Sequence, residues 1–106
     1  IYLRKDATLY ECAHELAHAE HYLKWQSGTP PWEKVPRITK EMTVFNKLRE
    51  PWIWRYLSVE QRQDAIDVLR LYGSLEGHTG KDAVGRNILR LINEASQELN
   101  IPRVIP

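Results

Sequence analysis

The sequence lacks long apolar runs, a pair of cysteines and an excess of charge of one sign. No apolar run approaches the roughly 20 residues that a bilayer-spanning helix needs, so we expect no membrane span. The single cysteine, Cys12, excludes a disulfide within this chain and is most simply a small buried apolar side chain. Fifteen basic and 14 acidic residues are interspersed and leave a formal net charge of +1, so the sequence does not predict a nucleic-acid partner.

The length of 106 residues is enough for one hydrophobic core and too short for two. It predicts a single domain over residues 1–106. The sequence has no signal peptide and begins without methionine, directly in a segment with the pattern of a strand. We therefore expect a domain cut from a larger protein.

Helical patterns cover most of the chain. Thr8 is suited to cap a helix, with Glu11 three residues later as its capping-box partner, and Ser58 and Gln61 form a second such pair. The sequence predicts helices over about 8–26, 38–49, 58–73 and 81–99, a short strand over 1–4, an aromatic connector over 52–57, and an extended tail over 101–106 beside the strand. We therefore expect a mainly α fold of about four helices with a short N-terminal strand element.

The first predicted helix carries two distinct stripes. Residues at steps of three and four form an apolar stripe that we predict to face the core: Leu9, Cys12, Ala13, Leu16, Ala19 and Leu23. His14, His18 and His21 fall on another stripe, within about 60° of each other on a helical wheel. A simple surface helix does not need stacked histidines, although three exposed histidines on a solvated helix would be the plainest interpretation.

The segment 14–18 reads His-Glu-Leu-Ala-His, which matches the pattern H-E-x-x-H. Histidines four residues apart lie on one helix face, so the imidazoles of His14 and His18 can bind the same metal ion. Glu15 can then reach a water molecule on that ion and act as a general base. His21 lies about 10 Å along the helix axis from His14, which is too far for all three histidines to bind one ion.

A catalytic zinc site needs a third protein ligand and one open position for water. Our preferred third ligand is Glu41, which follows His18 by 23 residues in the first turn of the second predicted helix. Compensation of the helix dipole would also explain a glutamate there. Asp64 and Asp67 in the third predicted helix are alternative ligands. His78 lies in a glycine-rich loop, from which it could donate a hydrogen bond to an oxyanion or simply face solvent.

Four segments together carry a resemblance to a known family: 2–8, 14–18, 22–25 and 40–45. They resemble the zincin-like metallopeptidase toxin domains at the C-termini of bacterial polymorphic toxins. The resemblance covers about the first half of the chain, and the second half matches only in its general helical layout. It implies that His14, His18 and Glu41 bind zinc and that Glu15 is the general base.

The predicted function is that of a zinc-dependent endopeptidase. A peptide substrate could pair along the edge of the strand at 1–4. The resemblance further implies a secreted or delivered effector domain that acts in the cytoplasm of a target cell and is neutralised by a cognate immunity protein. The alternative is a non-catalytic helical module, which binds a protein partner through Trp32, Trp52 and Trp54 and whose metal is structural or absent.

Overall fold

The computed structural model describes residues 8–25 and 31–104, and this part of the chain is mainly helical, as predicted. The elements, in chain order, are α1 (Leu9–Trp25), the 3-10 helix η1 (Trp32–Lys34), α2 (Arg37–Leu48), α3 (Pro51–Trp54), α4 (Val59–Leu75) and α5 (Ala83–Gln97). Four of these helices are the long ones that the sequence predicts, and α3 is a single turn that overlaps the start of the predicted aromatic connector. The described residues contain no strand, and the predicted strand at 1–4 lies outside them.

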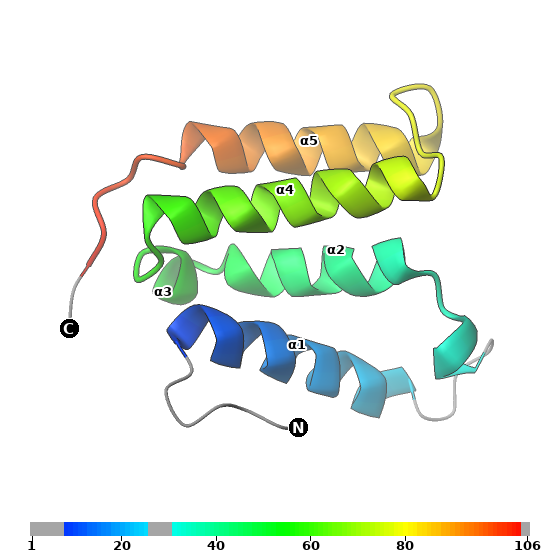
Figure 1. The fold of residues 1–106 in the computed structure, drawn as a ribbon, viewed down its shortest axis with the longest axis horizontal. Helices are drawn as coiled ribbons and strands as arrows, with labels where there is room; N and C mark the ends of the chain where they lie inside the picture. The colour runs from blue at the N-terminus through cyan, green and yellow to red at the C-terminus, as the bar shows by residue number, and fades with distance from the viewer. Residues whose placement is uncertain (1–7, 26–30, 105–106) are drawn as a thin grey trace.

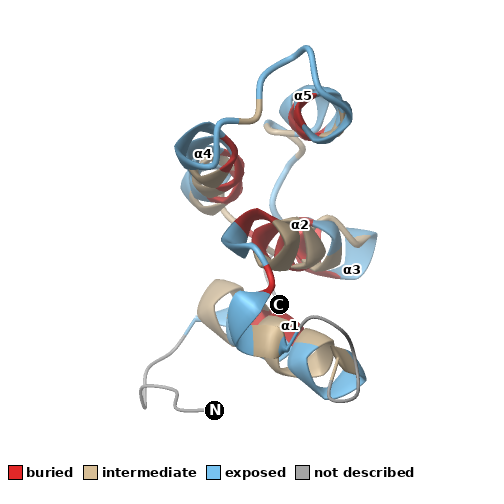
Figure 2. Cartoon of the chain, turned by 90° about the vertical axis from the view of Figure 1, so that its right-hand side faces the viewer, coloured by how far each residue is buried: buried red, intermediate tan, exposed pale blue. Residues whose placement is uncertain are grey.

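The long helices lie side by side in the spatial order α1, α2, α4, α5, with each packed against the next (Figure 1). The resulting body measures 40 × 33 × 19 Å. Figure 2 shows that the buried faces of α2, α4 and α5 are directed toward one another. Because α2 packs on α1 with one face and on α4 with another, it carries side chains of the core and side chains of the α1–α2 interface on the same short helix.

The start of α2 is held by a carboxylate from a distant part of the chain. Pro36 stands at the N-cap and offers no side-chain hydrogen bond, but Glu76 Oε2 accepts a 2.6 Å hydrogen bond from the backbone N–H of Ile38. A negative charge at a helix N-terminus is also favoured by the helix dipole. Because α2 begins at Arg37, Glu41 lies in the second turn and not in the predicted first turn.

The two N-caps that the sequence predicts, at the starts of α1 and α4, are confirmed. Ser58 and Gln61 form the predicted capping box at the start of α4, and Thr8 Oγ1 accepts a hydrogen bond from the backbone N–H of Glu11 at 3.2 Å. The sequence predicts that α4 ends near Gly73, but the helix continues through this glycine to Leu75. Gly73 is buried, and a Cβ atom there would lie 3.0 Å from Ile88 Cδ1, so the glycine permits close packing of α4 on α5.

The prediction for the core-facing side of α1 was wrong in part. Its buried residues are Ala13 and Ala17, whereas Leu9, Leu16 and Leu23 are 44%, 45% and 61% exposed. Small alanine side chains let α1 approach α2 closely, and this orientation turns the histidine stripe toward α2. The leucine stripe is left facing outward, and Cys12, on the same side, is only partly buried.

The core-facing residues of α2 are Ile38, Val44, Phe45 and Leu48, which are all buried. A buried cation joins this core to the C-terminal tail. Arg62 is 0% exposed, and its guanidinium donates hydrogen bonds to the carbonyl oxygens of Trp54, Arg55, Leu99 and Ile101.

The described part of the tail lies against the end of α3, where the backbone N–H of Val104 donates to Arg55 O at 2.8 Å. The predicted pairing of the tail with residues 1–4 involves residues outside the described ranges.

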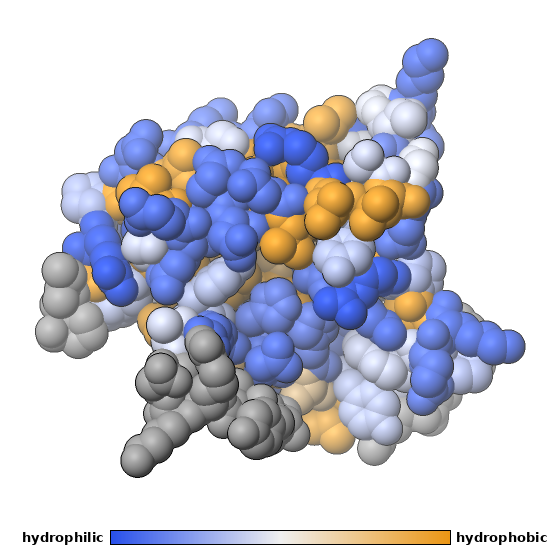
Figure 3. Space-filling model, viewed as in Figure 1, coloured by the Kyte–Doolittle hydropathy of each residue, from blue (hydrophilic) through white to orange (hydrophobic). Residues whose placement is uncertain are grey.

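The surface is largely polar, with scattered apolar side chains. Figure 3 shows hydrophobic residues over α4, where Leu71 and Leu75 are exposed. Among the described helices, none combines the length and the apolar character that crossing a membrane requires.

Candidate metal centre

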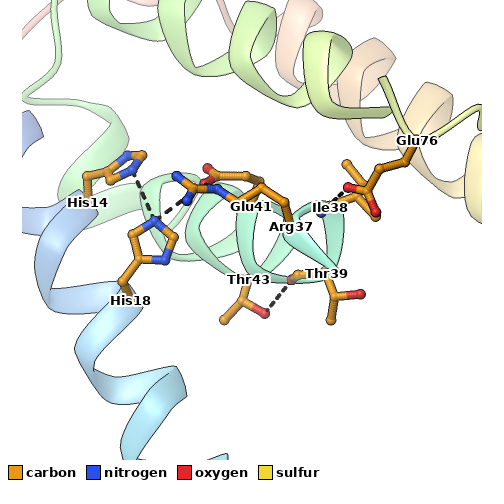
Figure 4. A network of polar contacts seen from close by, with 8 residues as sticks. All are labelled: His14, His18, Arg37, Ile38, Thr39, Glu41, Thr43 and Glu76. Carbon is orange, nitrogen blue, oxygen red and sulfur yellow. Dashed lines mark hydrogen bonds and ion pairs between the residues drawn. The ribbon is translucent and has the colours of Figure 1, made fainter. Parts of the chain in front are cut away.

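Three side chains from α1 and α2 converge on one point. His14 and His18 lie one turn apart on α1, and Glu41 faces them from α2 (Figure 4). The Nε2 atoms of the two histidines are 3.2 Å apart, and His18 Nε2 lies 3.4 Å from Glu41 Oε1. Ligand atoms of all three residues lie within 4.8 Å of one another, so the group could hold a metal ion. The structure thus brings together the three residues that the sequence predicts as ligands.

Glu41 is a buried carboxylate, at 2% exposure. Burial by itself would raise its pKa, but the hydrogen bond with His18 and the charges of Arg37, His18 and His14 outweigh burial and hold the pKa of Glu41 below its ordinary value. Arg37 contributes through its Nε, which donates a 2.7 Å hydrogen bond to Glu41 Oε1. A surface glutamate that only compensates a helix dipole would not be buried among these groups, so its surroundings favour the ligand interpretation.

His14 is held in the form that a metal ion requires. Burial is the largest cause of a lowered pKa for His14, and the charge of His18 acts in the same direction, while Glu41 opposes both. The neutral imidazole, whose ring nitrogen has a free lone pair, is therefore favoured at neutral pH.

A cleft of about 730 Å³ opens directly above the two histidines. Its lining includes His14, Glu15 and His18 from α1, and Arg37 from α2. Glu15 is exposed in this cleft and therefore faces the solvent side of the histidine pair. Glu41 does not line the cleft, because its carboxylate approaches the histidines from the buried side, where it borders a cavity of only about 10 Å³.

Neither aspartate that we considered as an alternative ligand belongs to the group. Asp64 accepts a 2.5 Å hydrogen bond from the hydroxyl of Tyr10, and burial together with this bond raises the pKa of Tyr10. The Tyr10 ring in turn contacts the ring of His14 edge to face, with centroids 6.2 Å apart. Asp64 therefore supports His14 indirectly through Tyr10. Asp67 is exposed and accepts hydrogen bonds from neighbours on its own helix.

The two remaining histidines of interest lie away from the group. His21 packs edge to face on Trp32, with ring centroids 4.9 Å apart. This contact agrees with the expectation that His21 does not bind the same ion as His14. His78 pairs with Asp82 through a 2.7 Å contact between Nδ1 and Oδ2 and lines a different pocket, so the structure does not place it where it could donate to an oxyanion in the cleft.

Six further residues line the cleft, and sequence analysis gave none of them a place there. It predicted that Ala19 and Leu23 face the core, assigned Trp32 to a protein-binding surface, and gave no role to Tyr22, Arg37 and Lys40. The position of Arg37 four residues before Glu41 was the available signal, since residues at this spacing are neighbours on a helix. Trp32 and Lys40 come together only through the loop between α1 and α2. Their contact, with Lys40 Nζ 4.3 Å from the centroid of the Trp32 ring, has no counterpart in the sequence pattern.

The tryptophans proposed as a common binding surface lie in separate places. Trp54 is buried and donates a hydrogen bond to Glu98 O, while Trp52 is exposed beside Lys47. Trp32 belongs to the cleft. No shared platform is formed by these three side chains.

Comparison with known proteins adds no relative: no family model matches the chain, and no curated protein or solved structure does so either.

Proposed function

We propose that this protein is a zinc-dependent endopeptidase with its ion held by His14, His18 and Glu41. The observation that carries the proposal is that these three side chains converge beneath an open cleft that is lined by His14, His18 and Glu15. Two imidazoles and one carboxylate are a donor set of catalytic zinc sites in peptidases. This proposal agrees with the sequence resemblance to zincin-like domains.

Two of the three ligand-atom separations suit zinc. Ligands at about 2.0–2.1 Å from a tetrahedral ion are about 3.3 Å from one another. The separation is 3.2 Å between the two histidine Nε2 atoms and 3.4 Å between His18 Nε2 and Glu41 Oε1, and the ligand atoms of the whole group lie within 4.8 Å of one another. Arg37 also contacts Glu41 Oε1, but a carboxylate has about four lone-pair sites and can accept from Arg37 while it binds an ion.

The asymmetry of the site favours catalysis over a structural role. Structural zinc sites are closed by four protein ligands, whereas catalytic sites keep one position open. Here Glu41 covers the buried side, while the opposite side opens into the cleft. A water molecule or a peptide carbonyl oxygen can enter from that cleft.

The exposure of Glu15 in the cleft beside His14 supports a role as general base. A bound zinc ion would polarise the scissile carbonyl and make a water molecule on it more acidic. Glu15, beside His14 and open to the cleft, takes the proton of the attacking water and returns it to the leaving amine. Because its carboxylate must remain free to carry this proton, Glu15 acts without binding the ion.

The biological setting that we propose rests on the sequence resemblance alone. It is that of a secreted or delivered effector domain that cleaves a protein in the cytoplasm of a target cell. A cognate immunity protein would then be the second partner, besides the substrate.

The test is the substitution Glu15→Gln. The variant should bind zinc as tightly as the wild type but lose proteolysis and toxicity to a cell that expresses it, because an amide cannot accept the proton. Zinc content, peptide cleavage and growth of expressing cells are measured on the same variant. Full activity in Glu15→Gln would contradict the assignment of the base.

A second candidate function is a non-catalytic module that binds a protein. The observation that favours it is the exposed stripe of Leu9, Leu16 and Leu23, which follow one another at steps of seven residues and so share one face of α1. Toxicity that persists in Glu15→Gln but is lost when Leu16 is replaced by Glu would favour this alternative.

A further inference from the structure

The two walls of the cleft differ in charge. The α1 wall presents the apolar or aromatic side chains of Ala19, Tyr22 and Leu23 beyond the histidines. The α2 wall presents two cations, Arg37 and Lys40. These two residues are three apart on a helix, so their side chains leave the same face of α2.

Lys40 has no carboxylate partner among the described residues. Its ammonium lies 4.3 Å from the centroid of the Trp32 ring, a cation–π contact that holds the side chain along the cleft without neutralising its charge. Lys47, on the same helix, is instead placed 3.7 Å from Glu20 and 3.9 Å from Glu50. The charge of Lys40 therefore remains available to a ligand in the cleft.

Arg37 adds a second cation close to the candidate metal centre. Its Nε donates to Glu41 Oε1 at 2.7 Å, and the guanidinium lies 5.1 Å from the centroid of the Tyr72 ring. The side chain is 52% exposed, and its terminal N–H groups can still donate to a ligand. Arg37 and His18 contact the same oxygen, Glu41 Oε1, at 2.7 and 3.4 Å, and both line the cleft with Lys40, so an anion held by Arg37 and Lys40 would lie beside a substrate bond held above the histidines.

We propose that the cleft selects peptides that carry a carboxylate near the scissile bond, and that Lys40 is the specificity-determining residue. The carboxylate accepts hydrogen bonds from Lys40 and Arg37, while an adjacent apolar side chain of the peptide lies against Tyr22 and Leu23. This inference rests on the proposed peptidase function. Two sources can supply the carboxylate: an internal Asp or Glu side chain, or the free C-terminus of the peptide.

The test uses zinc-loaded protein and a proteome-derived peptide library in which C-termini are either free or amidated. Cleavage sites are identified by mass spectrometry. We expect cleavage near Asp or Glu to exceed cleavage near Asn or Gln by about tenfold, which corresponds to about 1.4 kcal/mol. A preference for Asp or Glu that persists with amidated C-termini assigns the carboxylate to a side chain. Cleavage near the C-terminus that is lost on amidation, whatever the neighbouring side chains, assigns it to the terminus.

The matched variants are Lys40→Glu and Lys34→Glu. Both change the net charge equally, but Lys34 is exposed on η1 and does not line the cleft. Lys40→Glu should shift the preference from acidic to basic residues without loss of zinc, and Lys34→Glu should retain the wild-type pattern. Cleavage by the wild type with no charge preference would overturn this inference and leave the peptidase function intact.

Binding is measured separately, so that the two proposals can fail independently. Zinc-loaded Glu15→Gln is titrated into fluorescent, degenerate peptide pools with one position fixed as Asp or Asn. The peptidase proposal fails and the carboxylate site stands if the wild type cleaves no peptide but Glu15→Gln binds the Asp pool more tightly than the Asn pool. Adding Lys40→Glu to Glu15→Gln should then remove this difference in affinity. If the library is not cleaved and neither pool binds preferentially, both proposals are overturned.

Discussion

Replacing Glu41 by Gln should separate zinc binding from the stability of the fold. The amide keeps the size of the buried side chain and can still accept a hydrogen bond from Arg37, but it removes the charge that faces His18. Loss of groups that only orient metal ligands commonly costs about 10–100-fold in affinity, so loss of a charged ligand should cost at least as much. We take about 100-fold as the expected loss.

The size of the effect on stability follows from linkage. With free zinc at 100 times the wild-type Kd, binding stabilises the fold by about 2.7 kcal/mol, whereas a Kd that is 100-fold weaker leaves about 0.4 kcal/mol. For a chain of 106 residues, the difference corresponds to roughly 10 °C in the zinc-dependent rise of Tm.

The assay is thermal unfolding of each variant with zinc and with a chelator. The comparison within each variant removes any change in the stability of the metal-free fold. Glu15→Gln is the matched control, because it makes the same substitution on the cleft side and should retain the full zinc-dependent rise. Equal rises in Glu41→Gln and the wild type would refute the assignment of Glu41 as a ligand.

Three further predictions concern pH, the core and the alternative ligand. Zinc affinity should fall as pH decreases, because protons compete with the ion for its ligands, and the lowered pKa of His14 should keep that ligand available to more acidic pH than an ordinary histidine. Titrations at several pH values test this, and a pH-independent affinity would contradict it. Arg62→Met should lower the free energy of unfolding by at least about 3 kcal/mol, because it leaves buried carbonyl oxygens without a donor. The control Arg90→Met removes an exposed ion pair with Glu94 and should change the free energy of unfolding by less than about 0.5 kcal/mol. Both values are measured by denaturant unfolding. Asp64→Ala should leave the zinc affinity within a few-fold of the wild type in a direct titration, because Asp64 contacts Tyr10 and not the metal group; a loss as large as that of Glu41→Gln would contradict this.

The part of the site that follows from local geometry could be predicted from the sequence. A helix over residues 9–25 places His14 and His18 one turn apart, whatever the rest of the chain does. Glu41 was predicted from its residue type and its position in the next helix, but its approach to within 3.4 Å of His18 depends on how α1 packs against α2. That packing is a tertiary property that a single sequence does not encode in its periodicity.

The orientation of α1 shows where periodicity fails. A stripe of leucines and a stripe with alanines compete for the core, and apolar content alone favours the leucines. The structure buries Ala13 and Ala17, since small residues allow close helix packing and since this arrangement joins the histidines to the buried Glu41. Gly73 was misinterpreted for a related reason, because a glycine that admits a neighbouring helix has the same sequence signal as one that ends a helix.

The zincin-like character and the peptidase activity remain predictions, and the metal site is the claim on which they depend. The most direct test is a crystal structure of the protein grown with zinc, with anomalous diffraction data collected on both sides of the zinc absorption edge. We expect one strong anomalous peak at about 2.0–2.2 Å from Nε2 of His14, Nε2 of His18 and a carboxylate oxygen of Glu41. A well-ordered site with these side chains in place and no peak between them, at a zinc concentration above 1 mM or so, would contradict the account.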